Sequence, residues 1–145
     1  MASNRKAARE ALATLLTTAL VGSGKPVQAL YDYRPADFGG QSPVVTVSSA
    51  GTRRRRMTAM GSRATPLLRV DMFVVYSDQA TWTEADTEDA LDDLEAAVAG
   101  VLDDNQRTAA WQALDYADAS QRMSAVIGGV EYAWESIQVA VEVYG

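Results

Sequence analysis

Residues 67–76 read LLRVDMFVVY. Apolar side chains occupy every second position from Leu68 to Tyr76, while Arg69 and Asp71 fall between them. Because successive side chains of a strand point to opposite faces, this alternation predicts a β-strand with one face against a core. The rest of that core must come from segments before and after the strand, and their patterns indicate the fold class.

Amphipathic helices are predicted on both sides of this strand. Over 4–20, apolar residues recur at three- and four-residue spacing, and a Gly-Ser-Gly turn at 22–24 can end the helix. Over 83–102, a second apolar stripe follows Thr81 and Glu84, which have the spacing of a capping box. The first stripe comprises Ala8, Leu12, Leu15, Leu16, Ala19 and Leu20, and the second Leu91, Leu94, Val98 and Val101.

Further strands are predicted at 26–31, 44–47, 122–127 and 130–143, with a possible short element at 111–114. Within 130–143 the apolar residues change parity, so one strand with one buried face needs a bulge near Glu135 and Ser136. The resulting order, α-β-β-β-α-β-β, predicts a single α+β domain over 1–145. Its sheet is antiparallel, with both main helices on one face.

A long polar loop is expected over about 48–66, between two of the strands. Loops of this length are uncommon in compact domains and are usually functional or mobile. This segment contains a run of arginines, whose planar guanidinium groups pair well with phosphate and carboxylate. The run has neither interleaved aromatic residues nor helical spacing, so recognition of bases is not expected. A solvated loop, contact with a phosphate backbone and docking on acidic protein stay open. The arginines are Arg53, Arg54, Arg55, Arg56 and Arg63.

The chain carries a net charge of −6, but its halves differ in sign. Residues 1–70 hold eleven Lys/Arg and three acidic residues, net +8, whereas residues 71–145 hold two Arg and sixteen acidic residues, net −14. This asymmetry favours contact with a polyanion or another copy of the chain, unless the halves neutralise each other internally. Candidates for an acidic interface are Glu84, Asp86, Asp89, Asp92 and Asp93. A convex helix face does not converge on a metal ion, so a solvated face is the alternative.

Composition removes several function classes. The 145 residues include no cysteine and no histidine, so thiolate and imidazole chemistry are absent. We therefore expect no enzyme, and no catalytic, cofactor-binding or metal site. No run approaches the ~18 apolar residues of a membrane span. Threonines interrupt the apolar part of the first helix, which favours an intracellular helix over a signal peptide and predicts no membrane contact.

The chain resembles the tail terminator proteins of long-tailed bacteriophages, also called minor tail or tail completion proteins. The resemblance rests on the helix over 5–20, the segment RPADFGGQSPVVTV (34–47), the strand MFVVY (72–76) and the acidic helix. It continues through the ending, from VIGGVEY (126–132) to VAVEVY (139–144). The resemblance spans nearly the whole chain and includes no catalytic signature.

This resemblance implies a structural virion protein that forms a hexameric ring on the last ring of tail tube protein. Such a ring ends tube growth and faces the head-side connector protein, while DNA passes through its bore. The resemblance also implies that the protein is located at the head-proximal end of the tail and assembles in the host cytoplasm. Another head–tail joining or neck protein and a cellular nucleic-acid-associated adaptor module are the alternatives. In a ring, the arginines at 53–56 would face DNA or, in the favoured interpretation, the acidic helix of the next copy.

Overall fold

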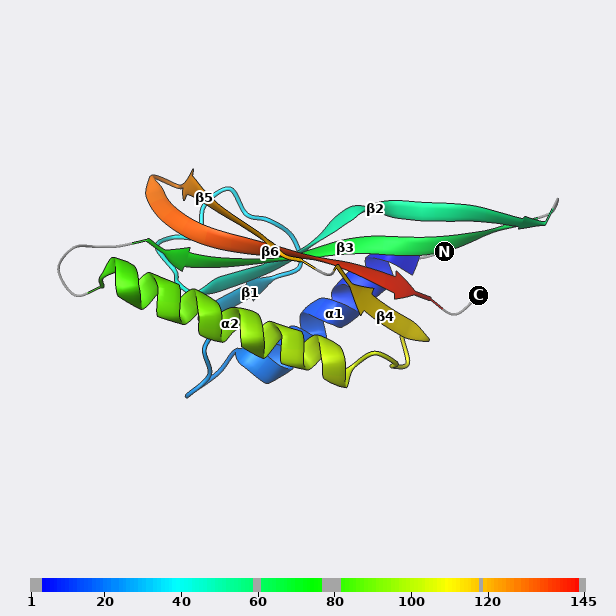
Figure 1. Ribbon diagram of the computed structural model, residues 1–145, viewed down its shortest axis with the longest axis horizontal. Helices are drawn as coiled ribbons and strands as arrows, with labels where there is room; N and C mark the ends of the chain where they lie inside the picture. Colours follow the sequence, from blue (N-terminus) through cyan, green and yellow to red (C-terminus); the bar gives the residue numbers. More distant parts are fainter. Residues whose placement is uncertain (1–3, 59–60, 77–81, 118, 144–145) are drawn as a thin grey trace.

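A six-stranded sheet carries two helices on one face in the computed structural model (Figure 1). Residues 4–58, 61–76, 82–117 and 119–143 are described, with the backbone alone for residues 4, 55–58 and 61–63. The architecture confirms the predicted α+β class and element order. Strand β4 lies where the sequence predicted a short element at 111–114. The elements are α1 (Asn4–Leu20), β1 (Ala29–Tyr31), β2 (Val44–Thr58), β3 (Gly61–Val75), α2 (Glu84–Asp104), β4 (Ala113–Tyr116), β5 (Gln121–Ile127) and β6 (Val130–Glu142).

The strands lie in the order β1-β2-β3-β6, and the far edge of β6 is shared by β4 and β5. All pairs are antiparallel except β1, which runs parallel to β2 over three residues. The predicted antiparallel sheet is therefore confirmed apart from this short edge. Because β4 and β5 follow each other along the same side of β6, they form one interrupted edge strand.

The main core lies between the sheet and both helices. Each helix buries one stripe at three- and four-residue spacing, as the apolar periodicity predicts. The membership differs in part: Ala19 is exposed, whereas Ala13 and Leu102 are buried. The alternating residues of β3 from Leu68 to Val74 face this core and are fully buried, while Arg69 on the other face is exposed. The face of the sheet turned away from the helices is called the outer face below.

The expected loop over 48–66 is wrong: these residues continue β2 and β3 as a paired hairpin. Pairing of β3 with β6 begins only at Leu67, so the part beyond it, residues 52–58 and 61–66, is a two-stranded arm. At the strand spacing of about 3.3 Å per residue the arm is about 20 Å long. It projects beyond the body of the molecule in Figure 1. Cross-strand backbone hydrogen bonds form without a hydrophobic pattern, which is why the sequence did not reveal it.

The expected bulge near Glu135 and Ser136 is also wrong. β6 keeps one continuous register with β3, from Ala140 opposite Leu67 to Tyr132 opposite Val75. The apolar residues of β6 change parity because the first half of the strand also buries side chains on the outer face. Val139 and Val141 face the helices, whereas Tyr132 and Trp134 face a second core on the outer face. This second core comprises Phe38, Val44, Phe73, Ile127, Tyr132 and Trp134.

The start of α2 corrects the predicted capping box. Thr83, not Thr81, is the N-cap: its hydroxyl accepts from the Asp86 amide (3.2 Å), and the Asp86 carboxylate accepts from the Thr83 amide (2.9 Å). Thr81 lies outside the described residues. Both threonines are followed three residues later by an acid, so spacing alone could not choose between them. One of the predicted interface acids, Asp86, is thereby used to begin the helix.

The hairpin between β5 and β6 depends on a glycine pair. Gly128 and Gly129 have φ values of 60° and 79°, the left-handed conformation that a two-residue hairpin loop requires. A Cβ atom on Gly128 would lie 2.4 Å from the carboxylate Oδ1 of Asp37, whereas one on Gly129 would meet nothing within 4 Å. The loop that contains Asp37 thus packs closely on this turn.

We therefore expect Gly128→Ala to lower the free energy of unfolding by about 2–3 kcal/mol, from backbone strain plus displacement of Asp37. Gly129→Ala is the matched control and should cost about 1 kcal/mol, from strain alone. Urea unfolding of both variants measures the difference. Equal losses for the two glycines would contradict the close approach of Asp37.

Candidate functional site

The arm carries all five predicted arginines on its backbone. Arg53 pairs with Thr65 and Arg55 with Arg63 across the hairpin. Strand alternation therefore puts positions 53, 55 and 63 on the outer-face side of the arm, and positions 54 and 56 on the helix side. The side chains of Arg53 and Arg54 are exposed, and those of Arg55, Arg56 and Arg63 lie outside the described part of the structure. Arginine positions thus occur on both faces of the arm.

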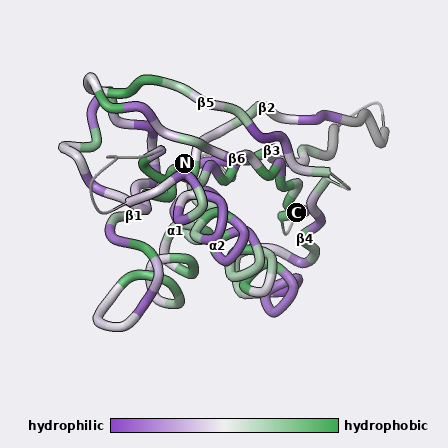
Figure 2. The backbone as a smooth tube through the Cα atoms, turned by 60° about the vertical axis from the view of Figure 1, so that its left-hand side comes forward, coloured by the Kyte–Doolittle hydropathy of each residue, from purple (hydrophilic) through white to green (hydrophobic). Residues whose placement is uncertain are grey.

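The base of the arm is fixed to the body. A register shift between Ser49 and Gly51 makes a β-bulge, and Gly51 adopts a φ of 139° there. Arg5, in the first turn of α1, donates a hydrogen bond from Nη1 to the Thr52 hydroxyl (3.2 Å). The arm leaves the sheet from this point, and its β2 strand is coloured partly hydrophilic in Figure 2. The charge of Arg53 and Arg54, which are exposed, is therefore the main chemical property of the arm's described side chains.

The predicted acidic residues lie on α2. Glu84, Asp89, Asp92 and Asp93 are exposed, while Asp86 caps the helix. Their neighbour Glu88 accepts hydrogen bonds at both carboxylate oxygens from Arg122 of β5 (Nη1–Oε2 2.7 Å), which lowers the pKa of Glu88. This leaves four of the predicted carboxylates directed to solvent.

The basic arm and the acidic residues of α2 lie far apart. Figure 1 shows the arm at one end of the long axis and the N-terminal half of α2, which holds the predicted acids, toward the other end. Ion pairs between described side chains include Lys6–Glu10 and Arg122–Glu88, each within one half of the chain. The opposite charges of the two halves are therefore displayed at different places on the surface.

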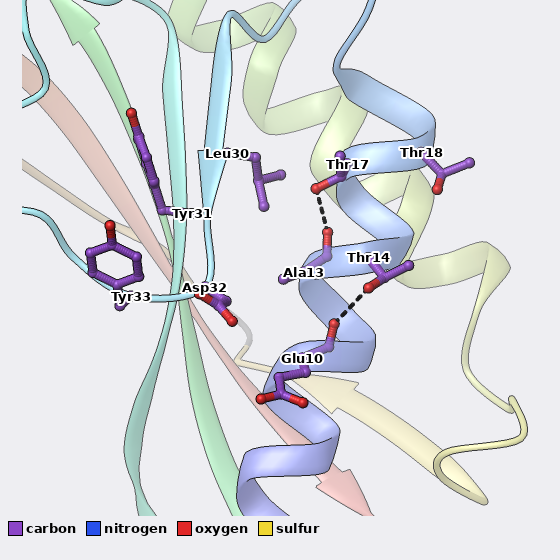
Figure 3. Close-up of a pocket in the computed structure, with 9 residues that line it drawn as sticks. All are labelled: Glu10, Ala13, Thr14, Thr17, Thr18, Leu30, Tyr31, Asp32 and Tyr33. Atoms are coloured by element: carbon purple, nitrogen blue, oxygen red, sulfur yellow. Dashed lines mark hydrogen bonds between the residues drawn. The ribbon is translucent and has the colours of Figure 1, made fainter.

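A groove of about 350 Å³ separates α1 from β1 and the residues after it (Figure 3). Glu10 projects from the helix wall and Asp32 from the opposite wall. Neither residue stands out in the sequence, because each is an isolated acid in a basic half. The lining comprises Glu10, Ala13, Thr14, Thr17, Thr18, Leu30, Tyr31, Asp32 and Tyr33.

A polar row crosses the outer face, where Thr46, Asp71 and Ser136 lie side by side on β2, β3 and β6. Thr46 and Asp71 are buried, and Ser136 is half-buried. Asp71 is 1% exposed, and burial raises the pKa of its carboxyl group. That pKa is lowered in part by a hydrogen bond with Ser136 and by the nearby guanidinium groups of Arg69 and Arg34, but burial is the larger effect. Thr46 Oγ1 and Asp71 Oδ1 have no hydrogen-bond partner among the described residues. The ionised carboxylate is therefore poorly accommodated in the folded state.

Asp71→Asn should increase the free energy of unfolding at pH 7. The pKa of Asp71 is higher in the folded than in the unfolded protein. The contribution of Asp71 to the free energy of unfolding is therefore lost as pH rises through the pKa of the folded protein. The advantage of the variant should therefore grow from pH 4 to pH 7 and vanish at lower pH. Urea unfolding across this range measures it, with Thr46→Val as an uncharged control. An advantage that is the same at every pH would contradict the assignment.

Within the described residues, no group of three or more acidic side chains is arranged to hold a metal ion. In the same part of the chain, no helix is long and apolar enough to cross a membrane. Comparison with protein-family models finds no match, and comparison with curated proteins finds none either. The features of the surface that bear on function are the arm, the acidic helix and the groove.

Proposed function

We propose that this chain is a structural protein that forms a ring at the head-proximal end of a phage tail. In this role it caps the tail tube, ends tube growth and joins the tail to the head-side connector, without catalytic activity. It would assemble in the host cytoplasm and remain in the virion. The resemblance of the sequence to tail terminator proteins supplies this specific role, and the surface of the molecule supports assembly from identical copies.

One observation carries the proposal: surfaces of opposite charge lie at separate places on one chain. Arg53 and Arg54 have no ion-pair partner among the described residues, and their charge therefore favours contact with an acidic surface of the next copy. Such a head-to-tail contact is heterologous, and it generates a closed ring when its rotation closes. The hexamer is the stoichiometry that the resemblance implies.

The arm also supports contact with DNA in the bore of such a ring. Its arginine positions lie on both faces, so one face can contact a neighbouring copy while the other faces phosphate. Contacts to phosphate alone carry no sequence information, and they therefore permit DNA to pass through. Each copy would contribute the same positive charge to a collar around the bore.

The purified protein is therefore expected to form rings at low ionic strength and to dissociate as salt rises. Charge attraction at an exposed interface is screened over about 8 Å at physiological salt. Negative-stain electron microscopy shows the rings, and sedimentation velocity between about 20 mM and 1 M NaCl follows their mass, a range over which the screening length falls severalfold. A monomer at low salt and at high protein concentration would contradict the proposed ring.

A further inference from the structure

The lining of the groove between α1 and β1 includes two carboxylates and no basic side chain. Its charged groups are the carboxylates of Glu10 and Asp32. Thr14 donates its hydroxyl proton to the Glu10 carbonyl oxygen (3.0 Å) and Thr17 donates to the Ala13 carbonyl oxygen (2.7 Å), as Figure 3 shows. A hydroxyl whose proton is used in this way presents only lone pairs to the groove. The matching occupant is a group that donates hydrogen bonds and carries positive charge.

Neither carboxylate is saturated within the molecule. Asp32 has no hydrogen-bond or ion-pair partner in the described part of the chain. Glu10 has Lys6 at 4.0 Å, a pair in which both side chains are at least half exposed and which contributes little. Both carboxylates, on opposite walls of the groove, are therefore available to a cation that enters it.

The aromatic residues of the lining favour arginine over lysine. Tyr33 is 57% exposed and meets Tyr31 edge-on, with 5.8 Å between ring centroids. A guanidinium group can stack on an aromatic face while its planar fork donates to carboxylates, which an ammonium group cannot do. The same chain already uses this geometry, because the Arg34 guanidinium lies 5.2 Å and 5.1 Å from the ring centroids of Phe73 and Trp134.

The arm is the arginine-rich element of the chain, but it extends away from the groove of its own molecule. Its base contacts the first turn of α1 through Arg5 and Thr52, and from there it projects beyond the body (Figure 1). Arg53 and Arg54 are exposed and have no ion-pair partner among the described residues. A second copy can present these side chains to the groove, whereas the parent copy cannot.

We infer that the groove is the site on each copy that receives an arginine side chain from the arm of the next copy. This contact deepens the proposed ring and depends on it. Compared with the convex acidic face of α2, the groove offers two walls, facing carboxylates and an aromatic surface around one side chain. Of the two acidic surfaces, the groove is therefore the one shaped to hold a guanidinium group.

The test compares two double variants with the parent protein by sedimentation velocity at low salt. Glu10→Gln with Asp32→Asn removes both carboxylates of the groove and should weaken self-association at least about tenfold, as expected for lost charge-assisted hydrogen bonds. Asp89→Asn with Asp93→Asn makes the same charge change on α2 and should leave association close to the parent's. Circular dichroism and thermal unfolding check that each variant is folded.

Mixing an arm variant with the groove variant, Glu10→Gln with Asp32→Asn, gives the sharper test. An arm variant with serine at positions 53–56 keeps its groove, and the groove variant keeps its arm. At a protein concentration at which the parent assembles and each variant alone is monomeric, the two variants together should form a 1:1 complex that does not grow into rings. If the α2 variant fails to assemble while the groove variant assembles normally, the arm docks on α2 and the inference is overturned. No complex in the mixture would also overturn it, and a monomeric parent protein would instead refute the proposed ring itself.

Discussion

Replacing Arg53, Arg54, Arg55 and Arg56 with serine is expected to abolish ring assembly while changing the monomer's free energy of unfolding by no more than about 1 kcal/mol. These positions belong to the part of the β2–β3 hairpin that pairs with no other strand of the described sheet. Arg53 and Arg54 are exposed. Their removal therefore leaves both cores intact and takes away the charge that a neighbouring copy would bind.

Electron microscopy and sedimentation measure assembly, and urea unfolding measures the monomer. A variant with lysine at the same four positions is the control: it keeps the charge, but it loses the bidentate donors and the flat stacking surface. Rings that form normally but fail to retain or eject DNA would assign the arm to the bore. If the serine variant assembles and functions like the parent, the arm is a solvated hairpin with no role in assembly.

The parts of the fold that the sequence could predict are those in which one face of an element is buried. Both helices and the β3 strand show this periodicity, and each lies where its pattern places it. The antiparallel sheet and the position of the helices follow from the order of these elements. These features depend on burial of apolar side chains, which periodicity reports directly.

The features that could not be predicted depend on contacts without such a pattern. The arm is held by backbone hydrogen bonds between polar strands. Its polar sequence, with arginines at 53–56, is typical of a loop, and the strands could not be predicted from it. The continuous register of β6 was hidden because Tyr132 and Trp134 pack on one face and Val139 and Val141 on the other. A rule that assumes one buried face interprets this arrangement as a bulge.

The candidate site was predictable only in its charges. The arginine run and the acidic helix are visible in the sequence, but whether they meet within one molecule depends on the topology, which separates them. The groove brings Glu10 and Asp32 onto facing walls, although they are 22 positions apart along the chain. No spacing rule connects a helix residue to one that follows an edge strand, so this pair needed the structure.

Phe38 should be the residue of the loop between β1 and β2 on which the second core depends most. It is 2% exposed, and its ring lies 4.9 Å from that of Phe73 and 5.4 Å from that of Tyr132, both edge-on. Phe38→Ala is expected to lower the free energy of unfolding by about 3–4 kcal/mol, because it removes a buried ring and leaves a cavity between strands and loop. Urea unfolding measures this loss.

The same loop also forms one wall of the groove, through Asp32 and Tyr33. Phe38→Ala should therefore weaken self-association even under conditions in which the monomer remains folded. Tyr33→Ala is the control for stability alone, since Tyr33 belongs to the groove: the residue is 57% exposed, so its loss should cost less than about 1 kcal/mol of stability. If Phe38→Ala proves as stable as Tyr33→Ala, the outer face of the sheet does not depend on this loop for its cover. A stability loss without any loss of association would show that the groove wall, formed by Asp32 and Tyr33, keeps its shape without the ring of Phe38.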